Sequence, residues 1–205
     1  MSDVFTHRVE IYTANLVLTG SYDMAIYRRM TDAINGEQRR YVPLRDATVA
    51  PLERPQQAQR VPQLLVDRED IMLVAALDEA VPPPDYMAPE PTRGVVPVTV
   101  MIFTGAFVMR ATMHKRPDFS LSDALDRQTN DYLPLTNVQI FPLLGGFAPV
   151  SRSIAALLRS QIVALYQAGE PPRPEPVAPA APALPADDTP VGPAVLEEDA
   201  PEPQS

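Results

Sequence analysis

The sequence predicts a mainly β protein, made of two tandem small domains and a disordered C-terminal tail. Three observations predict this class. The body repeats itself at an offset of 91 residues, apolar and polar residues alternate within each copy as in a strand, and 17 of the 25 prolines fall in one linker and the tail. Each domain is expected to be a small β-barrel or β-roll of about five strands and one short helix. The predicted boundaries are 5–80 for copy 1, 81–97 for the linker, 98–169 for copy 2 and 170–205 for the tail.

The repeat needs no gap over most of the body. Between Val9 and Leu52, the chain and its counterpart 91 residues later share 11 identities in 44 positions, and many differences are conservative. Further along, Arg68 and Ile71 meet Arg159 and Ile162 at the same offset. A period this long exceeds that of solenoid units, so it indicates a tandem duplication of a whole small domain.

The first elements of each copy have the pattern of a strand pair. Val9, Ile11 and Thr13 alternate with polar or aromatic neighbours, which is the period of a half-buried strand. Ala14-Asn15 then stands where a tight turn would lead into a second strand, and Gly105-Ala106 stands there in the second copy.

A short helix is expected next. Thr31 in copy 1 and Ser122 in copy 2 each precede an aspartate, Asp32 or Asp123. A hydroxyl can cap the first N–H groups of a helix, and an acid in the first turn suits the helix dipole. Capping explains this pair of residues more completely than catalysis, because neither aspartate has an identifiable acid or base partner.

Two further strands and a turn complete each copy. Tyr41 and Tyr132 open the third strand, which carries a proline two residues later and is therefore expected at an edge or a bulge. Asp67–Asp70 lies between two apolar runs, the pattern of a hairpin. In copy 2, residues 154–167 have helical spacing when taken alone, but agreement with copy 1 favours a hairpin that turns at 159–161.

The motif V-x-I-x-T, followed by [TS]-D-x-[IL]-[ND], Y-[VL]-P-L and L-[VL]-x-R-x-x-I, resembles a domain of uncharacterised bacterial proteins. Its strand layout is loosely similar to Sm-like and SH3-like barrels. The resemblance covers both copies and implies no established activity. Neither copy has the glycine-bearing RNA-binding signature of the Sm-like proteins, so the resemblance implies no RNA-binding residue.

Most of the net charge of −9 belongs to the tail. Residues 170–205 contain eight acids and one arginine, a net of −7, which leaves −2 for residues 1–169. Eleven prolines and few bulky apolar residues predict that the tail is disordered, because it cannot bury enough surface to offset ordering. A solubilising role is favoured over that of a P-x-x-P peptide ligand.

The composition excludes most chemistry. Cysteine is absent and only His7 and His114 are histidines, so thiolate and multi-histidine metal sites are excluded, and both histidines are expected at a surface or an interface. Gly145-Gly146 lacks the frame of a phosphate loop, and no G-x-S-x-G occurs. The sequence therefore predicts no enzyme, no catalytic residue, no cofactor and no metal site.

An arginine cluster confined to copy 1 is the candidate binding surface. Its arginines flank the predicted helix, with two tyrosines among them: Arg28, Arg29, Arg39, Arg40, Arg45, Tyr27 and Tyr41. Three interpretations remain open, namely a solvated face of salt bridges, a surface for an acidic partner or for the acidic tail, and a nucleic-acid surface.

Location and partners follow from these exclusions. The first residues lack a secretory pattern, and the most apolar stretch, 95–109, is shorter than the ~20 residues of a membrane span. A cytoplasmic protein with no membrane contact is expected. Its predicted function is that of a non-catalytic interaction or scaffold protein, which binds a protein partner, a second copy, or one domain with the other. The alternative is an arginine-mediated nucleic-acid-binding protein of Sm-like or SH3-like type.

Overall fold

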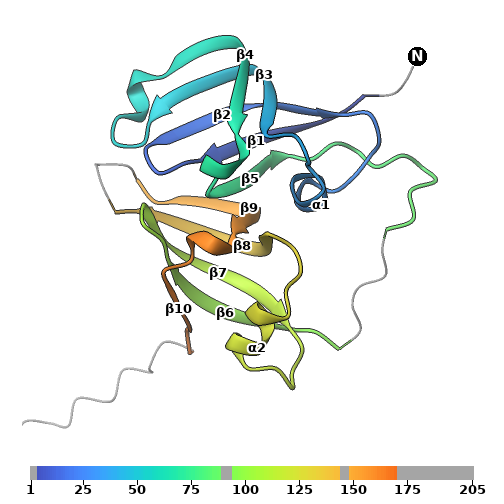
Figure 1. The fold of residues 1–205 in the computed structure, drawn as a ribbon, viewed down its shortest axis with the longest axis vertical. Helices are drawn as coiled ribbons and strands as arrows, with labels where there is room; N and C mark the ends of the chain where they lie inside the picture. The colour runs from blue at the N-terminus through green and yellow to red at the C-terminus, as the bar shows by residue number, and fades with distance from the viewer. Residues whose placement is uncertain (1–3, 89–93, 144–147, 170–205) are drawn as a thin grey trace, which may run out of the picture. The chain divides into compact units, whose positions relative to one another are not determined.

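Ten strands form one antiparallel sheet in the computed structural model, which describes residues 4–88, 94–143 and 148–169 (Figure 1). The strand order is β10-β6-β7-β8-β9-β5-β1-β2-β3-β4. The prediction of a mainly β chain with short helices is confirmed. The prediction of two separate barrels is not, because the sheet is open, with β10 and β4 as its edges, and runs from one half of the chain into the other. The predicted disordered tail, 170–205, lies outside the described residues.

The two halves contain the same strands and α-helices in the same order. The first half comprises β1 (Phe5–Tyr12), β2 (Leu16–Met24), α1 (Met30–Asn35), β3 (Tyr41–Pro51), η1 (Pro55–Gln57), β4 (Gln59–Asp67), η2 (Arg68–Asp70) and β5 (Leu73–Asp78). The second half comprises β6 (Val96–Phe103), β7 (Phe107–Lys115), α2 (Leu121–Asp126), β8 (Tyr132–Pro142), β9 (Val150–Leu158), η3 (Arg159–Gln161) and β10 (Ala164–Gln167). From β1/β6 to η2/η3, the bounds of each pair differ by 91 residues. Hence each residue has a counterpart 91 positions away in the other half.

The turns are placed as predicted, but the strands on either side of them do not form hairpins. Arg68–Asp70 and Arg159–Gln161 are short 3-10 turns, and residues 154–167 form the end of β9, η3 and β10 rather than a long helix. However, β4 pairs with β3 whereas β5 pairs with β1 and β9, and β10 pairs with β6 rather than β9. The prediction of a hairpin in each half was therefore wrong, because the turn sends the last strand to the opposite end of its five-strand set.

The helix caps also differ from the prediction. Ser120, not Ser122, accepts a hydrogen bond from the Asp123 N–H at 3.1 Å, and the Asp123 carboxylate accepts one from the Ser120 N–H. Thr31 lies inside α1, whose N-cap residue is Arg29 and whose Met30 N–H donates to the Glu79 carboxylate at 3.1 Å. The expected hydroxyl cap therefore stands two positions earlier in α2 and is replaced in α1 by an acid from beyond β5.

A bulge bends the middle of both halves at matching positions. The register of β2 with β3 shifts between Thr19 and Ser21, and the backbone of Asp46 opposite has a φ of 47°. Asn137, the counterpart of Asp46, has a φ of 51°. Asp and Asn tolerate this left-handed conformation better than other residues with a Cβ. The pair Asp46/Asn137 is therefore explained by backbone geometry and not by charge.

We expect Asp46→Ala to lower the free energy of unfolding by about 1 kcal/mol, because alanine lacks the local hydrogen bonding that offsets a positive φ. Asp46→Asn is expected to leave stability unchanged, as asparagine stands at the counterpart position. Urea denaturation of both variants and the wild type measures the difference. Equal losses in the two variants would show that the charge of Asp46 matters instead.

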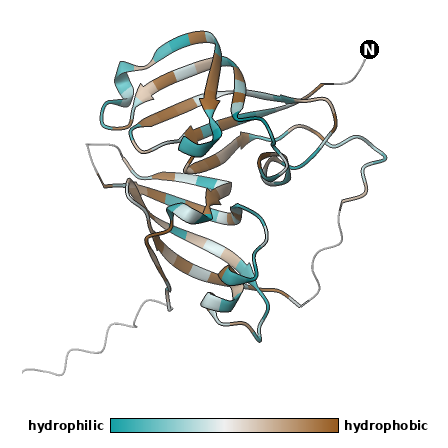
Figure 2. Cartoon of the chain, in the orientation of Figure 1, coloured by the Kyte–Doolittle hydropathy of each residue, from teal (hydrophilic) through white to brown (hydrophobic). Residues whose placement is uncertain are grey.

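The halves meet at a joint between β5 and β9, which lie side by side in Figure 1. Leu73 pairs with Leu157, Val74 with Ala156, and Ala75 with Ala155, and all of these are buried. Apolar and polar residues alternate along the strands (Figure 2), so each strand offers one apolar face to a core. Tyr12, Met72 and Leu73 from the first half belong to the core cluster of the second, so the two cores interlock at the joint.

Candidate functional site

A buried ion pair fixes the joint from one side. The Glu10 carboxylate of β1 lies 2.7 Å from the Arg152 guanidinium of β9 and accepts a hydrogen bond from the Tyr12 hydroxyl at 2.6 Å. The side chain of Glu10 is only 9% exposed. Burial, together with the adjacent carboxylate, raises the pKa of Tyr12, so its hydroxyl stays a donor at neutral pH.

Tyr132 of β8 fixes the joint from the other side. Its backbone N–H donates to Asn35 Oδ1 at 2.9 Å, its carbonyl accepts from Asn35 Nδ2 at 3.0 Å, and its hydroxyl donates to the Arg68 carbonyl at 3.2 Å. The Arg68 guanidinium lies 5.5 Å from the Tyr132 ring centroid and 2.9 Å from the Asp131 carboxylate. Burial raises the pKa of Tyr132 to about 12. Its counterpart, Tyr41, is half exposed.

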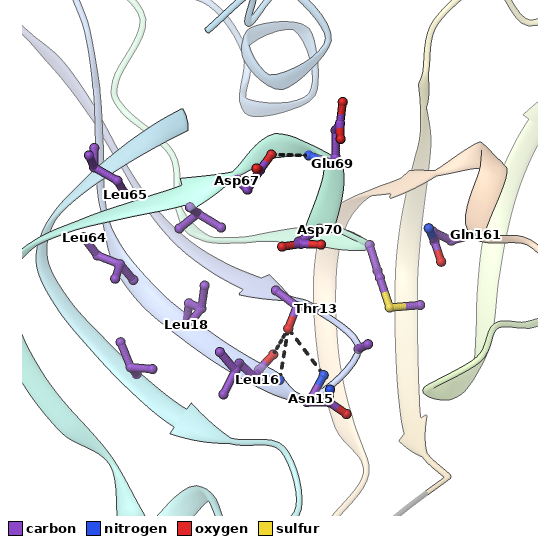
Figure 3. Close-up of a pocket in the computed structure, with 14 residues that line it drawn as sticks. Thr13, Asn15, Leu16, Leu18, Leu64, Leu65, Asp67, Glu69, Asp70 and Gln161 are labelled. Carbon is purple, nitrogen blue, oxygen red and sulfur yellow. Dashed lines mark hydrogen bonds between the residues drawn. The ribbon is translucent and has the colours of Figure 1, made fainter. Parts of the chain in front are cut away.

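A groove of about 450 Å³ runs beside the open edge strand β4 (Figure 3). Leu16 and Leu18 of β2 and Leu64 of β4 form its apolar part, and Asp67 and Asp70 line it at the η2 end. Leu65, next along β4, is 59% exposed. This edge therefore combines strand backbone, an apolar groove and an exposed leucine.

The other edge, β10, also carries exposed apolar side chains. Val163, just before β10, is 75% exposed, and Tyr166 is 52% exposed. The Tyr166 ring stacks on Phe103 of β6, with 6.2 Å between the ring centroids. The sheet thus ends in apolar side chains at both edges.

The arginines of the predicted patch are largely paired with acids. Arg39 pairs with Glu37 at 2.5 Å, Arg40 with Asp67 at 3.2 Å, and Arg45 with Asp23. The Arg45 guanidinium lowers the pKa of the Asp23 carboxyl. These three pairs match the interpretation of a solvated face of salt bridges.

The other members of the patch have different neighbours. The Arg28 guanidinium packs beside Gly36, where a Cβ would lie 2.5 Å from it, and among the described residues Arg28 and Arg29 form no salt bridge. Tyr27 packs edge-on between Phe5 and Tyr86. The Arg40 guanidinium lies 5.5 Å from the centroid of the Tyr41 ring. Acids therefore neutralise three of the five arginines of the patch.

Acid titration tests the best-buried of these carboxylates. Glu37 accepts a 2.7 Å hydrogen bond from the Tyr22 hydroxyl, and the Arg39 guanidinium beside it lowers the Glu37 pKa from 4.5 to about 2. A carboxylate whose pKa is lower in the folded state stabilises above its unfolded pKa and loses that effect as pH falls to its folded pKa. We expect the wild type to be more stable than Glu37→Gln at pH 7, with the difference shrinking between pH 4.5 and 2. Urea denaturation across that range measures it; a constant difference would contradict it.

The two histidines divide between core and surface. His114 is exposed, as expected. His7 is fully buried, which the sequence did not predict: its Nε2 lies 2.8 Å from the Arg28 carbonyl, and its Nδ1 accepts from the Ala80 N–H at 3.0 Å. The ring therefore fastens two loop segments to β1.

The remaining repeat positions are structural or exposed. Asp123 completes the capping box of α2, whereas Asp32 is exposed in the first turn of α1, and Ser122 donates a long hydrogen bond of 3.4 Å to Asp126. In the part of the chain that the structure describes, no group of three His, Asp or Glu side chains is placed to hold a metal ion. Neither α1 nor α2 has the length and hydropathy that crossing a membrane requires.

No protein-family model, no curated protein and no solved structure matches this chain.

The sequence did not indicate which apolar residues lie exposed at the edges of the sheet. Leu65, Val163 and Tyr166 are apolar residues in strand-like runs, like their buried counterparts Ala156, Met72 and Ala75. Only the strand order shows that one set lies inside the sheet and the other at its ends.

Proposed function

We propose that this chain is a non-catalytic interaction or scaffold protein, derived from a duplicated five-strand domain, and that it binds protein partners through its open sheet edges. The observation that carries the proposal is a difference in burial between two counterpart strands, β9 and β4. Ala156 on β9 is fully buried by β5, whereas its counterpart Leu65 on β4 is 59% exposed beside a groove. An edge strand with an adjacent apolar groove is the arrangement that takes up a further strand, with backbone hydrogen bonds giving affinity and side chains giving specificity.

A photo-crosslinking residue at position 65 tests this proposal in the cells from which the chain comes. The matched control is position 26, where Ile26 is equally apolar and exposed but lies in a loop away from both edges. We expect protein crosslinks from position 65 and not from 26, and we expect Leu65→Lys to abolish binding of the purified partner. Equal crosslinking at both positions would contradict the proposal.

The alternative function is nucleic-acid binding through the arginine patch. It predicts that polynucleotide affinity falls steeply with salt and is lost in the Arg28→Ala/Arg29→Ala variant. Pairing of Arg39, Arg40 and Arg45 with acids reduces the charge that this surface offers a phosphate backbone. We therefore expect only weak polynucleotide binding, unaffected by Leu65→Lys.

A further inference from the structure

We propose that the partner at these edges is a second copy of this chain, bound head to tail, with β4 of one copy paired antiparallel to β10 of the next. This inference rests on the proposed function, because it takes the open edges as the binding surface. It makes the contact between chains a repeat of the β5–β9 joint within the chain.

The register of the contact follows from that joint. β4 is the counterpart of β9, and β10 is the counterpart of β5. The joint pairs Leu73 with Leu157, Val74 with Ala156 and Ala75 with Ala155. Shifting each residue by 91 pairs Ala164 with Val66, Leu165 with Leu65, and Tyr166 with Leu64. The two strands that the chain leaves open, β4 and β10, are therefore the counterparts of the two that it pairs at the joint, β9 and β5.

The groove beside β4 is the counterpart of a space that is filled at the joint. In the second half, Tyr12 and Met72 of the first half pack among Phe107, Met109 and Leu157. The counterparts of these receiving residues include Leu16 and Leu18, which line the groove of about 450 Å³. The counterparts of the entering residues are Phe103 and Val163, which lie beside β10. The apolar side chains at one edge thus match the groove at the other.

The apolar face of α2 independently indicates that a neighbouring chain covers this surface. Met30, Ala33 and Ile34 of α1 are buried, and Tyr132 and Ala156 of the second half belong to the same core cluster. In α2, by contrast, no residue is buried, although Leu121, Ala124 and Leu125 are its apolar counterparts. Across the proposed contact, the half-exposed Tyr41 and Leu65 of the next chain cover these three residues.

The side-chain pairs across the joint mostly have compatible counterparts. The ion pair Glu10–Arg152 becomes Met101 and Val61, so both charges are replaced together by apolar residues. The pair Asn35–Tyr132 becomes Asp126 and Tyr41, which keeps an acceptor for the tyrosine N–H.

One pair does not carry over. Arg68–Asp131 becomes Arg159 and Arg40. Each of these arginines has a local partner, since Arg40 pairs with Asp67 and Arg159 donates to the Leu125 and Gln128 carbonyls. The proposed contact therefore lacks one ion pair of the joint and gains an apolar pair in place of another.

The proposed contact joins two different surfaces, β4 of one chain and β10 of the next. A contact between two different surfaces gives rings or filaments rather than a two-fold dimer.

Complementing edge variants test the head-to-tail arrangement. In the full chain, Leu65→Lys blocks β4 and Tyr166→Lys blocks β10, and Ile26→Lys is the control for an exposed apolar residue changed to lysine. Sedimentation velocity is expected to give assemblies larger than the 22.5 kDa chain for wild type and Ile26→Lys. Each edge variant alone is expected to be a monomer, and their mixture a dimer of twice that mass, because each partner supplies one intact edge. Unchanged circular dichroism of each variant shows that it is folded.

Three results would overturn the proposal. The first is a wild type that stays monomeric up to about 100 µM, where a micromolar contact is saturated. The second is a dimer of either edge variant alone, which indicates a two-fold contact between identical edges. The third is a mixture that stays monomeric. If the wild type is monomeric but position 65 still crosslinks to other proteins, the proposed function stands and only this inference fails.

The register has its own test, since the chain contains no cysteine. A mixture of Leu65→Cys and Leu165→Cys chains is expected to form a disulfide-linked dimer on oxidation, because directly opposed residues of an antiparallel pair lie within disulfide range. Gln167→Cys, two residues further along the same face, is the matched control and is expected to crosslink with Leu65→Cys at a small fraction of that yield. Equal yields at 165 and 167 would overturn the register.

Discussion

Replacing Arg152 by alanine is expected to lower the free energy of unfolding by about 3 kcal/mol. The Glu10 carboxylate is nearly buried, and the Arg152 guanidinium 2.7 Å away is the one cation that pairs with it among the described residues. Removing one partner of a buried pair leaves an uncompensated charge, which costs about 3–5 kcal/mol; the partial exposure of Arg152 places the expected loss at the lower end. Urea denaturation at pH 7 measures it.

A double variant provides the control. Glu10→Met/Arg152→Val installs the residues that stand at the counterpart positions, Met101 and Val61. Replacement of a buried ion pair by apolar residues of similar volume is often neutral. We therefore expect this variant to regain most of the stability that Arg152→Ala loses. A loss below about 1 kcal/mol in Arg152→Ala, as for an exposed pair, would show that the Glu10 charge is solvated.

His7→Leu is expected to lower the melting temperature by about 10 °C. The variant removes the imidazole and leaves its two partners, the Arg28 carbonyl and the Ala80 N–H, unpaired beside an apolar side chain. Each such buried group costs about 1–3 kcal/mol, and about 1 kcal/mol shifts the midpoint of a chain this size by 2–4 °C.

Two further variants separate this effect from a general one. His7→Gln offers one donor and one acceptor, so it is expected to lose less than His7→Leu. The exposed His114→Leu is expected to melt like the wild type. Similar losses at positions 7 and 114 would show that the two backbone contacts of His7 contribute little.

Local pattern was enough to predict the strands and turns, but not the strand pairing. The alternation of Val9, Ile11 and Thr13 indicates which face of a strand is buried, and it carries no information about the neighbouring strand. For this reason β4 and β5 were wrongly paired across Arg68–Asp70. Residues 154–167 show the same limitation of local pattern. Their apolar spacing is typical of a helix, yet pairing within the sheet makes most of them strand.

The candidate site was predictable only in part, for a related reason. The arginine cluster is visible in the sequence, but the partners of Arg40 and Arg45 lie 27 and 22 residues away, so their pairing depends on the fold. The open edges carry no local signal, because Leu65 and Tyr166 belong to runs as apolar as those of buried strands. The burial of His7 was likewise hidden, since its partners Arg28 and Ala80 come from distant segments.

The covalent link between β5 and β6 makes the joint an intramolecular contact. Seventeen residues, 79–95, connect these strands, and a short linker holds its ends at an effective concentration in the millimolar range. A contact between separate chains at micromolar concentration lacks this advantage of about a thousandfold, or about 4 kcal/mol. The tether thus allows the joint to hold with the small residues Ala155 and Ala156, whereas the proposed contact between chains has the larger Leu64 and Leu65 at the counterpart positions. Cutting the chain within 81–88 would turn the joint into a bimolecular equilibrium, and the two halves would then separate on dilution.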